Sequence, residues 1–203
     1  MNLNWRRLAI ISDIHGEYAR LERVVADLKD QGCDRIVCLG DLVEGGDSDE
    51  AVVQWIRDNG IECTRGNHDR KNDLGLPLQT QDFLMALPFK VVDDDLLFTH
   101  ISPRRWQTAV TDSDEAACIF NECKARIVFV GHTHAARLFA VFRDQPSEVI
   151  HFDVSMNTAI AVRPDGRYVV CVGAVGASRD KTLGPQYCLY DRVDGALEFR
   201  EAA

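Results

Sequence analysis

The chain has 203 residues, of which 46% are hydrophobic and 27% charged, and its formal net charge is −9. This length and apolar content suffice for a sizeable core, so an intrinsically disordered chain is excluded. Acidic residues outnumber basic ones by 32 to 23, which argues against a partner such as bulk nucleic acid or a membrane surface.

The first half of the chain alternates between predicted strands and helices. Apolar runs and helical spacing predict, in chain order, a strand at 8–12, a helix at 17–31, a strand at 35–39, a helix at 48–58 and a strand at 61–64. Ser48 stands at the N-cap position of the second helix. Strands that alternate with helices imply right-handed crossovers, so we expect a parallel sheet covered by helices.

The second half is richer in strands. Residues 89–92 and 96–99 flank Asp93-Asp94-Asp95, which we expect to be the solvated turn of a hairpin rather than a metal cluster. The further predicted elements are a helix at 113–123 and strands at 127–130, 137–143, 148–153, 158–162, 167–172, 186–192 and 196–200. This order predicts two packed sheets with helices outside, in one domain that spans residues 1–203.

The cysteines and apolar runs bear on the location of the protein. The seven cysteines include no CxxC pair and most stand within apolar runs, so we expect reduced thiols in the core. No apolar run reaches the roughly 18 residues of a membrane helix, and the N-terminus lacks the apolar stretch of a signal peptide. We therefore expect a cytoplasmic protein with no membrane partner.

Five of the six histidines directly follow predicted strands. The polar residues at these strand ends are Asp13, His15, Asp41, Asn67, His68, His100, His132 and His134. In open α/β sheets ligands bind beyond the carboxyl ends of the strands, so we expect these side chains around one crevice. The sixth histidine, His151, matches no motif and is expected to be structural or on the surface.

The spacing within these segments suits metal binding. Asp13 and His15 are two residues apart, as are His132 and His134, and strand side chains two apart point the same way. Glycines precede several of the candidate ligands at turns, where the missing Cβ permits a tight bend. A set of carboxylates, imidazoles and one amide suits Mn, Fe, Ni, Co or Zn better than Ca or Mg.

Together these segments are similar to those of a known family. Asp13-x-His15, Gly40-Asp41, Gly66-Asn67-His68-Asp69, His100 and Gly131-His132-Thr133-His134 resemble, in order, the five motifs of the calcineurin-like metallophosphoesterases. The resemblance spans residues 8 to about 134, and residues 175–180 resemble a segment of the small bacterial and archaeal phosphodiesterase branch. It implies an α/β (α+β) fold, a four-layer αββα sandwich of two mixed β-sheets flanked by helices.

The resemblance also implies a dinuclear site, in which two divalent metal ions are bound, with manganese preferred and Fe, Ni, Co or Zn as alternatives. The implied ligands are Asp13, His15 and His134 for one ion, Asn67, His100 and His132 for the other, and Asp41 as the bridge. His68 would face the substrate, oriented by Asp69. The implied enzyme is a phosphodiesterase in which a metal-bridging hydroxide attacks phosphorus and His68, as general acid, protonates the leaving oxygen.

Loops around the crevice bear on the substrate. Arg104 can bind phosphate and Trp106 can stack on a base, which makes a nucleotide one candidate among small phosphate esters; a solvent-facing loop is the alternative. We expect the polar loop 70–80 to form the opposite wall. Residues 40–46 lack the arginine of the protein-phosphatase motif, and substitutions in the segment before Arg179 leave its role open.

Several alternatives remain open from the sequence. Two are enzymes, a dinucleoside polyphosphate hydrolase and a phosphomonoesterase or protein phosphatase. The third is a protein-assembly scaffold of the same fold, but such members have lost active-site histidines, whereas His68, His100 and His132 are all present. The oligomeric state is also open, with a homodimer as one alternative.

Overall fold

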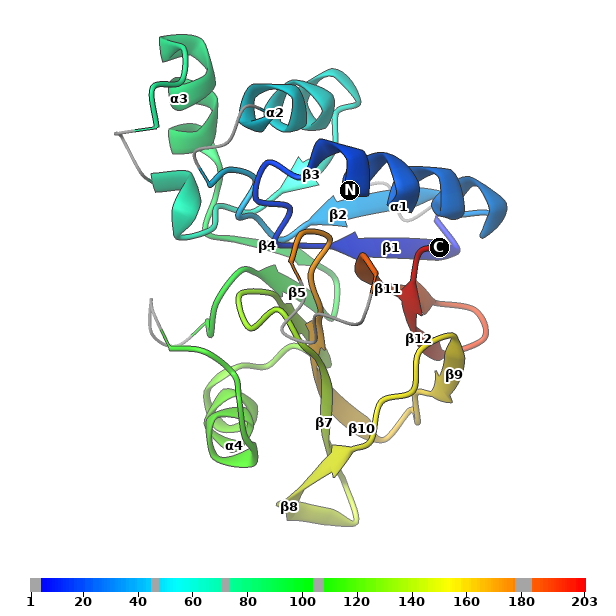
Figure 1. Ribbon diagram of the computed structural model, residues 1–203. Helices are drawn as coiled ribbons and strands as arrows, with labels where there is room; N and C mark the ends of the chain where they lie inside the picture. The colour runs from blue at the N-terminus through cyan, green and yellow to red at the C-terminus, as the bar shows by residue number, and fades with distance from the viewer. Residues whose placement is uncertain (1–4, 45–47, 71–73, 104–107, 178–183) are drawn as a thin grey trace.

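Two six-stranded mixed β-sheets face each other in the computed structural model, which describes residues 5–44, 48–70, 74–103, 108–177 and 184–203 (Figure 1). The first sheet has the order β3 (Glu62–Cys63), β2 (Arg35–Cys38), β1 (Arg7–Ile11), β11 (Gln186–Asp191), β12 (Ala196–Glu201) and β9 (Thr158–Ala161). The second has the order β4 (Lys90–Asp93), β5 (Leu96–Thr99), β6 (Ile127–Val130), β10 (Gly166–Val172), β7 (Ala136–Phe142) and β8 (Gln145–Phe152). Strands β1 to β3 are parallel, as are β5, β6 and β10.

Apolar side chains from alternate strand residues fill the space between the sheets. Leu8 and Ile10 of β1 point into this core, whereas Ile11 points to the other face, toward the helices. Phe98 and Phe129, on the neighbouring strands β5 and β6, stack with ring centroids 5.3 Å apart. Central strands are thus buried on both faces, which explains the continuous apolar runs in the sequence.

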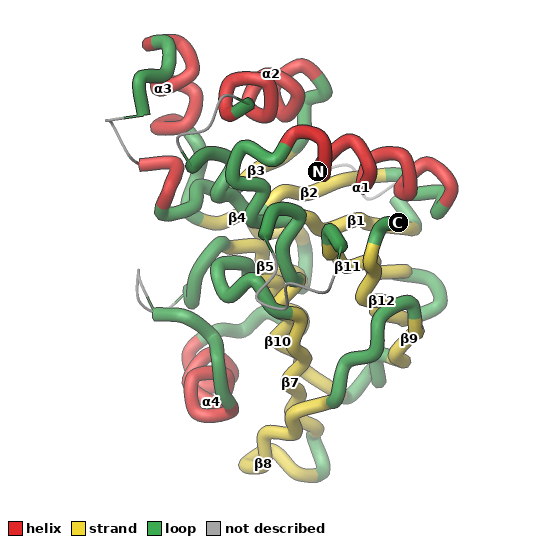
Figure 2. Tube along the Cα trace, in the orientation of Figure 1, coloured by secondary structure: helices red, strands yellow, loops and turns green. Residues whose placement is uncertain are grey.

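Helices cover the outer faces of both sheets (Figure 2). The helices are α1 (Tyr18–Asp30) and α2 (Asp49–Asp58) on the first sheet, α4 (Ser113–Glu122) on the second, and α3 (Leu78–Ala86) beside α2 and the 3-10 turn η1 (His68–Arg70). The layers helix, sheet, sheet and helix are those of the expected αββα sandwich. Within the described ranges, no helix is long and apolar enough to cross a membrane.

One helix differs from the prediction. All the predicted strands and helices are present near their predicted bounds, but α3 begins at Leu78, inside the predicted loop 70–80. Leu78 is 77% exposed while Leu84 is buried, so the apolar residues of α3 form no single stripe. The periodicity that reveals the other helices is therefore missing, and the loop prediction is wrong from Leu78 onward.

The turn of the predicted hairpin also differs at one residue. β4 and β5 form the hairpin and Asp94 is exposed as expected, but Asp93 is only 3% exposed. Its carboxylate accepts a hydrogen bond from Nε1 of Trp5 (3.3 Å) and pairs with the guanidinium of Arg35. The hairpin tip packs against the first sheet, so Asp93 is removed from solvent and the prediction of a fully solvated turn is wrong there.

The sequence predicts no catalytic or metal-binding role for the seven cysteines and His151. All seven cysteines lie in described parts of the chain as free thiols, four buried and three half-buried. Burial raises the pKa of the Cys171 thiol to about 12, so this thiol stays protonated at neutral pH. His151 is on the surface, where its ring stacks on Phe139 with centroids 4.7 Å apart.

Candidate metal centre

The chain segments that follow five strands, three in the first sheet and two in the second, meet at one place. They bring together three groups of side chains whose ligand atoms lie within 4.8 Å of one another: Asp13 with His15 and His134, His15 with Asp41 and His68, and Asp41 with His100 and His132. Asn67 joins the last group through its Oδ1, which lies 3.2 Å from Nε2 of His100. The structure therefore places all seven predicted ligands in one cluster.

The direction of these side chains comes from the backbone beyond the strands rather than from the strand pleat. β1 ends at Ile11, and Asp13 and His15 follow it in the left-handed region, with φ of 55° and 52°. His132 and His134 repeat this conformation after β6, with φ of 65° and 52°. The side chains of each pair do lie in the same cluster, but the predicted cause, alternation along a strand, is wrong, because these residues lie beyond the strands. Because left-handed backbone costs a non-glycine residue about 1–3 kcal/mol, its recurrence here marks a place where side-chain direction matters.

Glycines allow the ligand loops to approach one another closely. A Cβ at Gly66 would lie 2.1 Å from Oδ1 of Asp41, and a Cβ at Gly131 would lie 2.1 Å from Oγ of Ser12. Gly40 has a φ of +99°, which disfavours any other residue. The predicted turn role is confirmed for Gly40, whereas Gly66 and Gly131 are needed because no room exists for a side chain.

The first group has the spacing of ligands that share one ion. Nε2 of His15 lies 3.0 Å from Nε2 of His134, which in turn lies 3.3 Å from Oδ1 of Asp13. Metal–nitrogen bonds of about 2.0–2.1 Å place neighbouring ligands roughly 3 Å apart. Imidazoles and carboxylates are also donors that first-row divalent metals accept. These residues therefore fit a divalent ion.

A second group adjoins the first through Asp41. Nε2 of His100 lies 3.1 Å from Oδ2 of Asp41, and the same oxygen lies 3.7 Å from Nε2 of His15. Asn67 and His132 complete this group. Asp41 thus lies between the two groups, where a bridging carboxylate would be needed, and the second donor set also fits a divalent ion.

Hydrogen bonds behind the imidazoles fix which nitrogen faces the centre. Nδ1 of His100 donates to the carbonyl of Leu39 (3.0 Å), and Nδ1 of His134 donates to the carbonyl of Ala177 (2.7 Å). These bonds leave Nε2 of each ring as the ligand atom. Ala177 belongs to the 175–180 segment singled out in the sequence, so this segment supports the centre through its backbone.

Negative charge dominates the centre. Asp13 and Asp41 are 0% and 1% exposed. Burial opposes protonation of His100, but the carboxylates of Asp41 and Asp13 outweigh it and raise the pKa of this imidazole to about 9. Surroundings that hold a proton on a buried imidazole also attract a metal cation, which displaces that proton when it binds. The electrostatics of the cluster thus favour divalent cations.

The carboxylate of Asp69 contacts the backbone of the ligand loops. Its carboxylate accepts N–H hydrogen bonds from Asp41 (2.9 Å), Leu42 (2.7 Å) and Gly66 (2.8 Å). These bonds fasten the loop after β2 to the loop after β3. Asp69 thus positions the ligand loops, and its orienting role toward His68 stays a prediction.

Glu44 is the site residue that the sequence analysis missed. Its Oε2 lies 2.6 Å from Nδ1 of His68 and 2.8 Å from Nδ1 of His15. The rings of the two histidines meet edge to face, with centroids 4.8 Å apart. One carboxylate thus connects a candidate metal ligand with the candidate acid. The only signal in the sequence was its place three residues after Asp41, which by itself predicts no contact.

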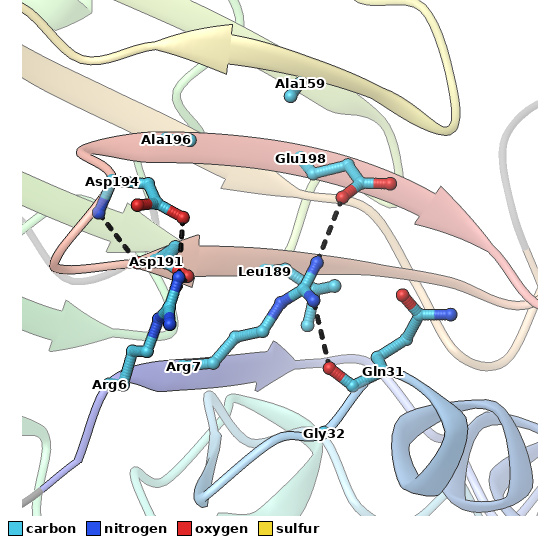
Figure 3. Close-up of a pocket in the computed structure, with 10 residues that line it drawn as sticks. All are labelled: Arg6, Arg7, Gln31, Gly32, Ala159, Leu189, Asp191, Asp194, Ala196 and Glu198. Atoms are coloured by element: carbon cyan, nitrogen blue, oxygen red, sulfur yellow. Dashed lines mark hydrogen bonds and ion pairs between the residues drawn. The ribbon is translucent and has the colours of Figure 1, made fainter.

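Two pockets of similar volume are lined by charged residues. The metal pocket, of about 440 Å³, is lined by His15, Glu17, Asp41, Glu44, His68, His132, His134 and Ala177. The Arg6–Arg7 pocket, of about 450 Å³, is lined by the ten residues labelled in Figure 3. There Arg6 donates to Asp191 and Asp194, and Arg7 donates to Glu198. Because the chain itself neutralises these arginines, the metal pocket is the stronger candidate for function.

Some predicted residues lie outside the described ranges. These are Arg104 and Trp106, predicted to bind substrate, and Arg179, whose role the sequence left open. Their contribution stays a prediction.

Known proteins share both this sequence and this fold. The model of the calcineurin-like phosphoesterase superfamily domain matches residues 7–195. An uncharacterized protein of Methanocaldococcus jannaschii is 26% identical over 218 residues, which cover 94% of this chain and 85% of that protein. The crystal structure of a metallophosphoesterase from Sphaerobacter thermophilus is similar with a TM-score of 0.83 and 28% identity, covering 98% and 89% of the two chains. A novel archaeal phosphodiesterase has the same fold, with a TM-score of 0.57 and 16% identity over 96% and 99%.

The chain therefore belongs to the calcineurin-like phosphoesterase superfamily. Members of this superfamily typically bind two metal ions, and the histidine and aspartate groups described above are the candidate ligands in this chain.

Proposed function

We propose that this protein is a dinuclear metal-dependent phosphodiesterase. The preference for diesters rests on the charge of the metal pocket, whose described lining includes Glu17 and Glu44 but no lysine or arginine. A phosphate monoester carries close to two negative charges at neutral pH, because its second pKa is about 6. A diester carries one, so Glu17 and Glu44 would repel it less when it lies beside the two cations.

In this proposal the ligands keep their expected roles. One ion is held by Asp13, His15 and His134, the other by Asn67, His100 and His132, and Asp41 lies between them. When bound, such a pair of ions lowers the pKa of a bound water and stabilises charge on the phosphate oxygens. The hydrogen bonds behind His100 and His134, the first of them buried, hold these rings in place before any ion binds.

His68 is assigned the role of general acid. It lines the metal pocket at the start of η1, its Nδ1 lies 2.6 Å from Oε2 of Glu44, and in this proposal its Nε2 protonates the leaving oxygen. Glu44 is assigned a positioning role, because its Oε2 lies 2.6 Å from Nδ1 of His68 and 2.8 Å from Nδ1 of His15. Asp69 acts one step further away, through the backbone that carries Asp41.

Metal content and substrate preference test the proposal directly. The purified protein is assayed for bound metal, and hydrolysis of bis(4-nitrophenyl) phosphate is compared with that of 4-nitrophenyl phosphate under Mn, Ni, Co and Zn. We expect two metal ions per chain and faster hydrolysis of the diester. A preference for the monoester would support a phosphomonoesterase instead. A metal-free protein that is inactive under all four metals would support the scaffold alternative.

His68→Ala tests the role of the acid. We expect this variant to bind metal normally and to lose about 10²–10⁴-fold in turnover of a diester with an alcohol leaving group. Its loss on bis(4-nitrophenyl) phosphate should be smaller, since nitrophenolate departs without a proton. His151→Ala is the matched control, because this ring lies on the surface against Phe139. Equal losses of turnover with the alcohol and the nitrophenolate leaving groups would contradict the role of His68 as general acid.

A further inference from the structure

The peptide group between Val175 and Gly176 lies between helix α1 and a candidate metal ligand. Its carbonyl accepts a hydrogen bond from Nε of Arg20 on α1 (2.8 Å), and its N–H donates to the carbonyl of Asp13 (2.8 Å). A trans peptide group is planar, so its C=O and N–H point in opposite directions within one rigid unit. The position of the Arg20 side chain is therefore transmitted through this unit to the backbone of Asp13.

The segment that contains this peptide group also supports a second ligand. One residue further on, the carbonyl of Ala177 accepts a hydrogen bond from Nδ1 of His134 (2.7 Å). A Cβ at Gly176 would lie 2.8 Å from the carbonyl oxygen of Asp13, so the segment and this ligand loop are in close contact. The segment 175–177 thus holds Asp13 by its backbone and His134 by its ring.

Both of these ligands depend on their surroundings for their conformation. Asp13 and His134 have left-handed backbone, with φ of 55° and 52°. Residues other than glycine keep such a conformation only where the contacts around them over-determine it. A hydrogen bond from a charged donor is stronger than one between neutral groups, and it polarises the peptide group that accepts it. The bond from Arg20 therefore strengthens the N–H donor that holds Asp13.

Stability alone does not explain the presence of Arg20. The side chain is half-buried, and within the described ranges it forms no ion pair. Its Nη2 is buried and has no hydrogen-bond partner among the described residues. Because a buried donor without a partner opposes folding, this arginine is a costly way to fill its position. Its bond to Val175 is the contact that distinguishes it.

We propose that Arg20 is a positioning residue of the metal centre: through the Val175–Gly176 peptide group it raises the affinity of the first ligand group for its ion. The inference rests on the assignment of the ligands in the proposed function. The charge of Arg20 acts in the opposite direction, because a cationic side chain beside the centre disfavours a bound cation. Loss of the hydrogen bond and loss of the charge therefore change metal affinity with opposite signs.

Two substitutions separate the hydrogen bond from the charge. In Arg20→Gln the side-chain nitrogen stands as many bonds from Cα as Nε of arginine, so a donor to Val175 is kept while the charge is lost. In Arg20→Met a methyl group stands there, so both are lost. Manganese is titrated into each metal-free protein by calorimetry. We expect Arg20→Met to weaken binding of one of the two ions by about 10–100-fold, as for other residues that support metal ligands, and Arg20→Gln to bind both ions at least as tightly as the wild type.

Amide hydrogen exchange in the metal-free proteins reports on the segment itself. The N–H of Gly176, which donates to the carbonyl of Asp13, should exchange about tenfold faster in Arg20→Met than in the wild type. In Arg20→Gln its rate should stay close to that of the wild type. This measurement requires neither bound metal nor activity, so it tests the positioning of the segment directly.

Arg23→Met is the matched control. Arg23 lies on the same helix, and its Nε donates to the carbonyl of Ala203 (2.7 Å), outside the segment 175–177. We expect this variant to keep both manganese affinities and the exchange rate of Gly176.

Three results would overturn the inference: wild-type affinities in Arg20→Met, equal weakening of both ions, or the same weakening in Arg20→Gln or Arg23→Met. Metal-dependent hydrolysis of bis(4-nitrophenyl) phosphate by the wild type would still leave the proposed function standing. A wild type that binds no manganese and hydrolyses no diester would overturn both.

Discussion

The metal pocket and the Arg6–Arg7 pocket have nearly equal volumes, about 440 and 450 Å³, but their charges are arranged in opposite ways. In the Arg6–Arg7 pocket each guanidinium lies on a carboxylate, with Nη2 of Arg6 2.7 Å from Oδ2 of Asp194 and Nη2 of Arg7 3.3 Å from Oε2 of Glu198. In the metal pocket, imidazole nitrogens and carboxylate oxygens converge, and its described lining contains no lysine or arginine.

This difference shows how a functional centre departs from a structural one. Exposed ion pairs contribute about 0–1 kcal/mol to the free energy of unfolding, and both of their charges come from the chain itself. Buried carboxylates that lack a fixed cation are costly unless a proton or a metal ion balances them. The high pKa of His100, about 9, is the sign of that imbalance in the metal pocket.

The largest effect is expected from substitution of Asp41, which lies between the two ligand groups of the metal pocket. We expect Asp41→Asn to lose bound metal and to lose more activity than the ~10²–10⁴-fold assigned to the general acid. The free energy of unfolding of the metal-free protein should fall, because burial opposes ionisation of Asp41 but His100 outweighs it and lowers the pKa of this carboxyl, so the carboxylate stabilises the fold at neutral pH. Metal analysis and denaturant unfolding in a chelator check both points. Full metal content in this variant would contradict the placement of Asp41.

Two glutamates of the metal pocket allow a matched pair of substitutions. Glu17 and Glu44 both line it, and Oε2 of Glu44 lies 2.8 Å from Nδ1 of His15 and 2.6 Å from Nδ1 of His68. We expect Glu44→Gln to lower kcat by about 10–100-fold, as for other residues that orient metal ligands. Glu17→Gln should stay near the wild-type rate. Equal effects of the two substitutions would show that Glu44 acts by general charge rather than by holding the rings.

Substitution of Asp93 tests the effect of a buried carboxylate whose charge is balanced by a cationic side chain of the same chain, that of Arg35. Burial opposes its ionisation, but Arg35 and Trp5 outweigh this effect and hold the pKa of the carboxyl below its ordinary value. The carboxylate therefore stabilises the fold above the unfolded-state pKa of about 3.9, and this stabilisation is lost as the pH falls through the folded-state pKa. We expect Asp93→Asn to lower the free energy of unfolding by about 1.5–3 kcal/mol at pH 7.

Denaturant unfolding at pH 7 and at pH 3 measures this effect. The difference between Asp93→Asn and the wild type should shrink at the lower pH, where the wild-type carboxylate begins to be protonated. Asp94→Asn, at the exposed neighbouring position, should leave stability nearly unchanged at both values. A constant difference at both pH values would mean that Asp93 acts through packing and not through its charge.

The smallest effect is expected in the Arg6–Arg7 pocket. Glu198→Gln removes the partner of Arg7 and of Arg200, whose Nη1 lies 2.7 Å from Oε1 of Glu198. We expect a loss of about 0.2–1 kcal/mol in the free energy of unfolding and no change in hydrolysis of bis(4-nitrophenyl) phosphate. A large loss of activity would show that this pocket takes part in function after all.

Much of the fold and of the site was predictable because its signals are local. Strands buried on both faces need continuous apolar runs, and such runs locate β1, β2, β5 and β6. Residues after those strands and after β3 are then candidate ligands, and the seven predicted ligands do converge. The helix α3 escaped prediction, since its apolar residues follow no stripe.

The chemical groups and the strand ends that carry them could be read from the sequence alone. How these groups meet depends on the tertiary structure. His15 and His134 are 119 residues apart in the chain, and their approach within 3.0 Å depends on the packing of two sheets and on left-handed backbone beyond each strand. The contacts of Glu44 with the histidine rings and of Asp69 with three backbone N–H groups arise in the same way. Periodicity reports only on neighbours a few residues apart, so it cannot show which distant side chain will balance a buried charge.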